Sequence, residues 1–150
     1  MKQFVFSGTL IGFIIITFLA IAEVAVLNTP HGVALDKTGN VIVTCQGGAN
    51  TVVVMSRTGE KLKEFGAERL TNPAGVAVDS AGRIIVANAG KNEIAIFDTE
   101  GNFLAAGTGV TNPQAVAIAP DGLIYVTDTG GNKIAVFDKT GEKIAFTIEN

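Results

Sequence analysis

The chain has 150 residues, with 14 acidic and 11 basic side chains and a net charge of −3. This balance gives no electrostatic reason to expect nucleic acid as a partner, because such binding needs a basic face. One cysteine and one histidine exclude a three-histidine or Cys/His zinc site built from a single copy of the chain. An apolar content of 47% and 18 glycines exclude a disordered chain and are typical of a β-protein with many tight turns.

The first 22 residues differ from the rest of the chain. Lys2 precedes a largely apolar run, and Ala20-Ile21-Ala22 places small residues at the −3 and −1 positions of a signal-peptidase cut before Glu23. The alternative is an uncleaved membrane anchor, because residues 4–22 are long enough to cross a bilayer as a hydrophobic helix. Both alternatives predict an extracytoplasmic protein, secreted, periplasmic or membrane-anchored, that meets a membrane only through this segment.

A segment that starts with proline then occurs three times. The copies are Pro30-His31-Gly32-Val33-Ala34-Leu35-Asp36, Pro73-Ala74-Gly75-Val76-Ala77-Val78-Asp79 and Pro113-Gln114-Ala115-Val116-Ala117-Ile118-Ala119. Their prolines are 43 and 40 residues apart. A period near 40 residues that contains only short strands predicts the blades of a β-propeller.

Each repeat predicts four short antiparallel strands. In chain order they span 32–36, 41–44, 51–55 and 61–65, then 75–79, 84–88, 93–98 and 102–106, then 115–119, 124–128, 133–138 and 142–146. The first strand of each repeat is almost wholly apolar, whereas the fourth carries more charge, for example Lys61, Lys63 and Glu64. This gradient predicts that the first strand lies at the centre and the fourth at the wet rim. Asp36 and Asp79 recur at one turn position, which indicates turn caps.

The third repeat carries a recognisable pattern in Ile124-Tyr125-Val126-Thr127-Asp128 and in Gly131-Asn132-Lys133-Ile134-Ala135-Val136-Phe137-Asp138. With the proline segments, it resembles the NHL repeat family over residues 28–150. The first repeat departs most, with Cys45 at the aspartate position. The resemblance implies an all-β fold of four-stranded propeller blades at about 28–66, 67–107 and 108–150, in a family whose members have six blades.

Three repeats supply half of such a ring. An open arc of three blades would expose apolar faces at both ends, and such patches mark an interface or an aggregation hazard. Three explanations stay open. Two chains form a homodimer that completes a six-bladed ring, the chain is a piece of a longer one, or the arc persists with partly protected ends.

Antiparallel strand order places the loops before the first strand and between the second and third strands at one edge. Loops that vary on a repeating scaffold are where binding is expected. The candidate binding residues at this edge are His31, Cys45, Asn88, Gln114 and Asp128. Cys45, Asn88 and Asp128 share one repeat position, and we expect them near the central axis. For Cys45 the alternatives are a small buried residue and an intermolecular disulfide.

The leading hypothesis is an exported scaffold that binds a protein, a peptide or a glycan, without catalytic residues or a cofactor. The alternative is a metal-dependent hydrolase or lyase, because propellers similar to this family include gluconolactonase-like and streptogramin lyase-like enzymes. The former hold a divalent cation with oxygen ligands, and Asn88 and Asp128 supply oxygens suited to Ca²⁺ or Mg²⁺. In a non-metal role, the two side chains bind the backbone of their own loops. His31 is the one candidate for the histidine base of the lyases.

Overall fold

A computed structural model describes residues 25–148 of the chain. The predicted N-terminal helix, as a signal peptide or anchor over residues 1–22, lies outside the described residues. Within residues 25–148, no helix combines the length and the apolar character needed to cross a membrane.

The described chain forms three antiparallel four-stranded sheets, each with its strands in sequence order. The first contains β1 (Pro30–Leu35), β2 (Val41–Cys45), β3 (Thr51–Met55) and β4 (Lys61–Phe65). The second contains β5 (Pro73–Val78), β6 (Ile84–Asn88), β7 (Glu93–Phe97) and β8 (Phe103–Gly107), with the short 3-10 helix η1 (Ala89–Lys91) after β6. The third contains β9 (Pro113–Ile118), β10 (Ile124–Asp128), β11 (Lys133–Phe137) and β12 (Lys143–Ile148). The prediction of three all-β propeller blades is confirmed.

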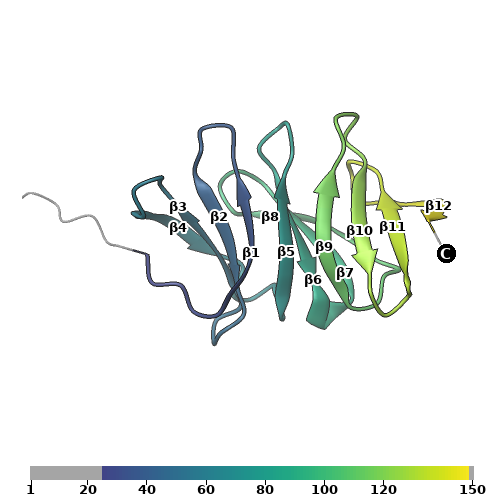
Figure 1. Ribbon diagram of the computed structural model, residues 1–150, viewed down its shortest axis with the longest axis horizontal. Coiled ribbons are helices and arrows are strands. Elements are labelled where there is room, and N and C mark those ends of the chain that lie inside the picture. Colours follow the sequence, from purple (N-terminus) through teal and green to yellow (C-terminus); the bar gives the residue numbers. More distant parts are fainter. Residues whose placement is uncertain (1–24, 149–150) are drawn as a thin grey trace, which may run out of the picture.

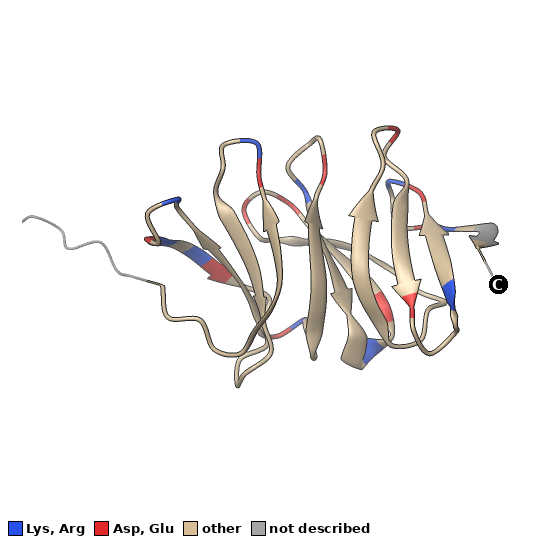
Figure 2. Cartoon of the chain, in the orientation of Figure 1, with Lys and Arg blue, Asp and Glu red and all other residues tan. Residues whose placement is uncertain are grey.

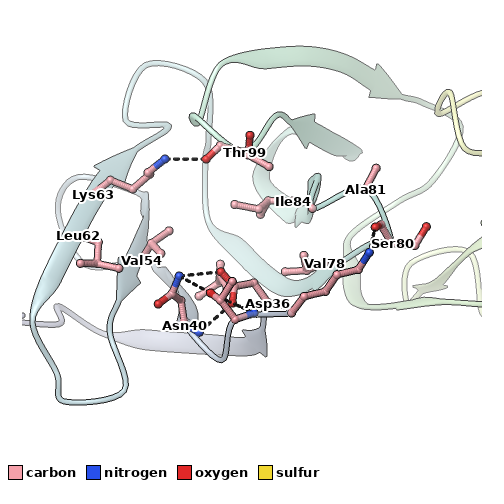
Figure 3. Close-up of a pocket in the computed structure, with 14 residues that line it drawn as sticks. Asp36, Asn40, Val54, Leu62, Lys63, Val78, Ser80, Ala81, Ile84 and Thr99 are labelled. Carbon is pink, nitrogen blue, oxygen red and sulfur yellow. Dashed lines mark hydrogen bonds between the residues drawn. The ribbon is translucent and has the colours of Figure 1, made fainter.

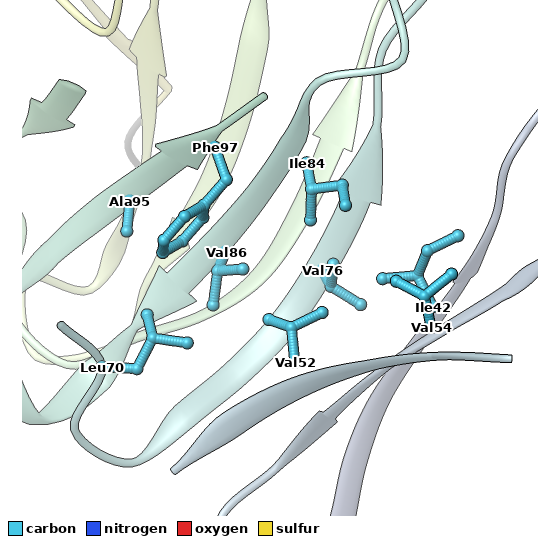
Figure 4. Packing of buried hydrophobic residues seen from close by; sticks show 9 residues of the cluster. All are labelled: Ile42, Val52, Val54, Leu70, Val76, Ile84, Val86, Ala95 and Phe97. Carbon is cyan, nitrogen blue, oxygen red and sulfur yellow. The ribbon is translucent and has the colours of Figure 1, made fainter. Parts of the chain in front are cut away.

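The sheets stand side by side, as blades one to three (Figure 1). β5 contacts β1 on one side and β9 on the other, so the first strands of the three repeats are neighbours. Apolar side chains fill the space between consecutive blades. Ile42, Val52 and Val54 of blade one pack against Val76, Ile84 and Val86 of blade two (Figure 4). The second junction is built in the same way, and each blade therefore gains its core from its neighbours.

The turn-capping interpretation of Asp36 and Asp79 agrees with the structure. The Oδ1 atom of Asp36 accepts hydrogen bonds from the backbone N–H groups of Thr38 and Asn40, each at 2.8 Å. Asp79 binds its own turn in the same way, at 2.9 Å to the N–H groups of Ala81 and Arg83. The sequence predicts that both aspartates end their strands, but each lies just after its strand, because its side chain satisfies the turn.

Asp98 and Asp138 cap the turns between the third and fourth strands of blades two and three. The side-chain hydrogen bond from Asn102 lowers the pKa of Asp98, and the one from Thr140 lowers the pKa of Asp138. Backbone N–H donors of the same turns act in the same direction. These carboxylates are therefore ionised turn caps.

Candidate functional site

The two edges of the arc differ in charge. We call the edge that carries the segments 46–50, 66–72, 89–92, 108–112 and 129–132 the loop edge. The charged residues of these segments are Glu68, Arg69 and Lys91, and the adjoining strand ends add Glu93, Asp128 and Lys133. The opposite edge, which we call the turn edge, carries the tight turns with most of the exposed charge (Figure 2). The loop edge is therefore rich in neutral amide and hydroxyl groups, such as those of Gln46, Asn72 and Thr129.

The shared repeat position of Cys45, Asn88 and Asp128 ends the second strand of each blade and is buried in all three. Asp128 Oδ1 accepts the backbone N–H of Thr111 at 2.6 Å and that of Gly131 at 3.1 Å. Asn88 Oδ1 accepts the N–H of Thr71 at 2.7 Å. Both side chains thus tie the strand end to the loop before the blade's own first strand. The expected bond to the residue's own loop is present for Asp128, through Gly131, whereas within the described residues Asn88 binds the backbone of the earlier loop only.

Burial raises the pKa of the Cys45 thiol, which also accepts a hydrogen bond from the Asn28 backbone. The thiol is 3% exposed and free. Cys45 thus occupies in blade one the place that Asn88 and Asp128 occupy in blades two and three. A neutral, buried thiol is a poor nucleophile, so Cys45 contributes to the packing of blade one and is not a reactive group.

Blade two adds an ionic network to this position. The Asn88 Nδ2 group donates to Glu93 Oε1 at 2.7 Å, and Arg69 pairs with the same oxygen at 2.6 Å. The Arg69 guanidinium also lies 4.3 Å from the ring centroid of Phe103. Both oxygen ligands proposed for a cation thus have protein partners, and Asn88 and Asp128 lie on different blades. Within residues 25–148, no group of three His, Cys, Asp or Glu side chains could hold a metal ion.

The two remaining candidates lie at the start of first strands. His31 is exposed on β1, and Gln114 is partly buried on β9, where its Nε2 group donates to Asn112 Oδ1 at 2.8 Å. The residue at the same position in blade two, Ala74, is fully buried. The structure therefore places His31 and Gln114 on the two outer blades of the arc, on either side of β5.

The sequence did not predict a pair of amide contacts that join consecutive blades at the loop edge. Asn50 Oδ1 accepts the backbone N–H of Asn72 at 3.0 Å, and Asn92 Oδ1 accepts that of Asn112 at 2.8 Å. All four residues have a positive φ between 46° and 55°. The signal was present in the sequence, since an asparagine recurs at 50, 92 and 132 shortly before each third strand.

A cavity of about 280 Å³ opens at the turn edge between blades one and two (Figure 3). Ile42, Val54 and Ile84 are among the apolar residues that line it. Lys63 Nζ donates across the junction to the carbonyl of Thr99 at 2.6 Å, and Lys37 Nζ donates to the carbonyl of Ser80. Both lysines therefore brace the two blades, and their ammonium groups are engaged with protein oxygens.

The NHL repeat family model matches residues 27–55, 70–97 and 111–137. A search of the curated proteins finds no match. Among solved structures, a streptogramin B lyase is 21% identical, with a TM-score of 0.70 over 88% of this chain and 43% of that one. A catalytically inactive virginiamycin B lyase from Staphylococcus aureus, with quinupristin, is 18% identical, with a TM-score of 0.66 over 80% of this chain and 41% of that one.

A structure of a nidogen/laminin complex is also similar, at 19% identity and a TM-score of 0.68, over 83% of this chain and 48% of that one. The chain thus spans less than half the length of these structures. At these identities the likeness shows the fold alone.

Proposed function

The chain belongs to the NHL repeat family, and from that premise we propose that it is a binding scaffold whose loop edge recognises a neutral, polar surface on a protein, a peptide or a glycan. The observation that carries the proposal is the composition of this edge, where amides and hydroxyls outnumber charges on a rigid frame of repeated strands. Such groups exchange hydrogen bonds with peptide groups or sugar hydroxyls without the desolvation cost of a buried charge.

The rigidity of the frame supports the same function. Strand ends are tied to the loops by Asn88 and Asp128, and consecutive blades are tied by Asn50 and Asn92. A preorganised edge loses little conformational entropy when a ligand binds. The recognition residues that the sequence indicates are His31 and Gln114. The side chain of His31 is exposed, and that of Gln114 is partly buried.

We further propose that the chain is exported, so that its partner lies outside the cytoplasm. The apolar leader and the Ala20-Ile21-Ala22 segment form the sequence pattern of a secreted or membrane-anchored chain. We accordingly place the binding edge on the extracytoplasmic side.

Selection from a displayed peptide library, together with screening on a glycan array, tests the proposed function. We expect at least one enriched peptide or glycan whose affinity falls at least about tenfold when His31 and Gln114 are both replaced by alanine. The matched control is Lys139→Ala at the exposed turn edge, which should change the affinity less than about twofold. Equal losses in the two variants, or no ligand that exceeds the background, would overturn the proposal.

The competing function is a metal-dependent hydrolase or lyase with Asn88 and Asp128 as ligands. The similarity in fold to a streptogramin B lyase is the observation in its favour. Against it, both side chains already accept backbone N–H groups, and Asn88 also donates to Glu93. A cation would have to displace those bonds.

Thermal melting with and without Ca²⁺ or Mg²⁺ separates the two functions. At a hundredfold excess over its dissociation constant, a bound cation would stabilise the fold by about 2.7 kcal/mol. We expect no rise in melting temperature for either cation, in the native chain or in Asp128→Asn. A rise in the native chain that Asp128→Asn abolishes would support the enzyme instead.

A further inference from the structure

Each blade has two faces, and the two internal junctions show what each face contacts. We call the face toward the following blade the forward face and the other the rear face. At the second junction, Ile85, Ile94 and Ile96 form the forward face of blade two, and they pack against Ile124, Val126 and Phe137 on the rear face of blade three. The first junction repeats this pattern. The two junctions therefore form a template for any further contact of the same kind.

Two faces of the described arc lack such a neighbour. On the rear face of blade one, Val33 and Leu35 are 67% and 65% exposed, although Leu27 and Ala25 pack against the rest of that face. On blade three, residues alternate along β10, so Tyr125 and Thr127 lie on the forward face. These two residues line a cavity of about 190 Å³ together with Ala115, Ala117 and Ile134.

The hydrogen-bonding groups on these two faces are complementary as well. Asn132, with φ of 53°, occupies the position of Asn50 and Asn92, and within residues 25–148 its side chain makes no hydrogen bond. Thr29, with φ of 51°, occupies the donor position of Asn72 and Asn112. The forward face of blade three thus offers the amide acceptor, and the rear face of blade one offers the backbone N–H.

A threonine on the forward face of blade three extends the match, by comparison with its counterpart Thr44 at the first internal junction. Thr44 Oγ1 accepts the N–H of Gly32 at 2.8 Å and donates to the carbonyl of Ala74 in the next blade at 2.5 Å. Thr127 occupies the same position and accepts the N–H of Ala115 at 2.8 Å. By the template of the first junction, its hydroxyl proton is directed toward the carbonyl of His31 in a following copy of blade one.

We propose that the forward face of blade three docks on the rear face of blade one of a second copy of this chain. The amide acceptor, the hydroxyl donor and the apolar surface of one face each have their counterpart on the other. Two such contacts, related by a twofold axis, close a ring of six blades, within the range of four to eight in which propellers close. This inference depends on blade packing and not on the ligand proposed above.

One residue makes this seam differ from the internal junctions. A Cβ atom at Gly32 would lie 2.5 Å from the carbonyl oxygen of Ala74, and one at Gly75 would lie 2.5 Å from that of Gln114. The third repeat carries Ala115 at this position, and its methyl group is exposed. The inner strands must therefore stand further apart at the seam than inside the arc, which makes the seam the weakest contact of the ring.

Disulfide trapping in the full chain tests the docking directly. Thr29→Cys combined with Asn132→Cys places one thiol on each face of the seam, and Asn50→Cys combined with Asn72→Cys is the matched pair inside the arc. Under oxidation we expect the first pair to give a covalent species of two chains and no higher ladder, and the second pair to link within one chain. The two single variants, Thr29→Cys and Asn132→Cys, control for disulfides through Cys45.

The mass of the native chain in solution, measured by light scattering, provides a second readout. We expect a dimer, and Ala115→Gly should lower its dissociation constant about fivefold by relieving the crowding at the seam. A ladder of covalent species would show an open filament and overturn the closed ring. If the native chain and Ala115→Gly are both monomers, and the pair Thr29→Cys with Asn132→Cys forms no interchain disulfide, the proposal is overturned. Another neighbour would then cover these faces.

Discussion

Phe97→Ala is expected to lower the free energy of unfolding by about 4 kcal/mol, because it truncates a large side chain in the middle of a blade junction. Phe97 is 1% exposed and lies in the core between blades one and two. Its ring centroid is 5.2 Å from that of Phe65 on blade one and 5.9 Å from that of Phe103 on blade two. Truncation therefore leaves a cavity at the joint between two blades and removes both aromatic contacts.

Denaturant unfolding followed by circular dichroism measures this loss, which corresponds to a fall in melting temperature of roughly 10 to 20 °C. Leu104→Ala is the control, because Leu104 lies in β8 of the same blade but is 51% exposed. It should cost less than about 1 kcal/mol. If the two variants lost the same free energy, the junction core would not be the main source of stability.

Asn88→Asp is expected to cost about 3 kcal/mol at neutral pH, although it changes a single side-chain atom from nitrogen to oxygen. Asn88 is fully buried, and its Nδ2 group donates to Glu93 Oε1. The new carboxylate would lose that hydrogen bond and place a second negative charge beside Glu93. Arg69 is already paired with Glu93 and cannot neutralise both carboxylates fully.

The pH dependence of the Asn88→Asp variant identifies the cause. The introduced carboxyl is buried beside the Glu93 side chain, so its own folded-state pKa rises above the unfolded value of about 4. The penalty is then fully present above the raised pKa and shrinks as the pH falls through it toward about 4. A loss of stability that is independent of pH would point to steric causes instead.

Asp128→Asn is the reciprocal control in blade three. Asp128 pairs across the strands with Lys133, whereas Asn88 pairs with Glu93. An asparagine at this position can still accept the N–H of Thr111, as Asn88 accepts that of Thr71. We expect a cost below about 1 kcal/mol, and a larger loss would show that the charge of Asp128 matters for more than the loop contact.

The fold could be predicted from the sequence because the repeat determines both the order of the strands and their number. The predicted starts of the first strands were wrong, because these strands begin at their prolines and not two residues later. Pro30 pairs with Cys45 across a break in register, and no periodic pattern of side chains reports such a bulge.

The candidate site was harder to predict. Their position along the repeat predicted that Cys45, Asn88 and Asp128 lie at the loop edge, but it did not predict the direction of their side chains. The side chains of Asn88 and Asp128 turn toward loops 17 residues earlier in the chain. That direction depends on packing between segments distant in sequence. The cross-strand pairs, Asn88 with Glu93 and Asp128 with Lys133, were a readable clue to a structural role.

The joints between blades have a consequence for how this surface can change during evolution. At Asn72 and Asn112 the donor is the peptide N–H, a group that every amino acid except proline possesses. The contact between blades therefore does not depend on the side chains at these two positions. The left-handed backbone still restricts which residues these positions accept. Under the proposed function, mutations there would alter ligand affinity while leaving the contacts between blades intact, so affinity and stability could be tuned separately.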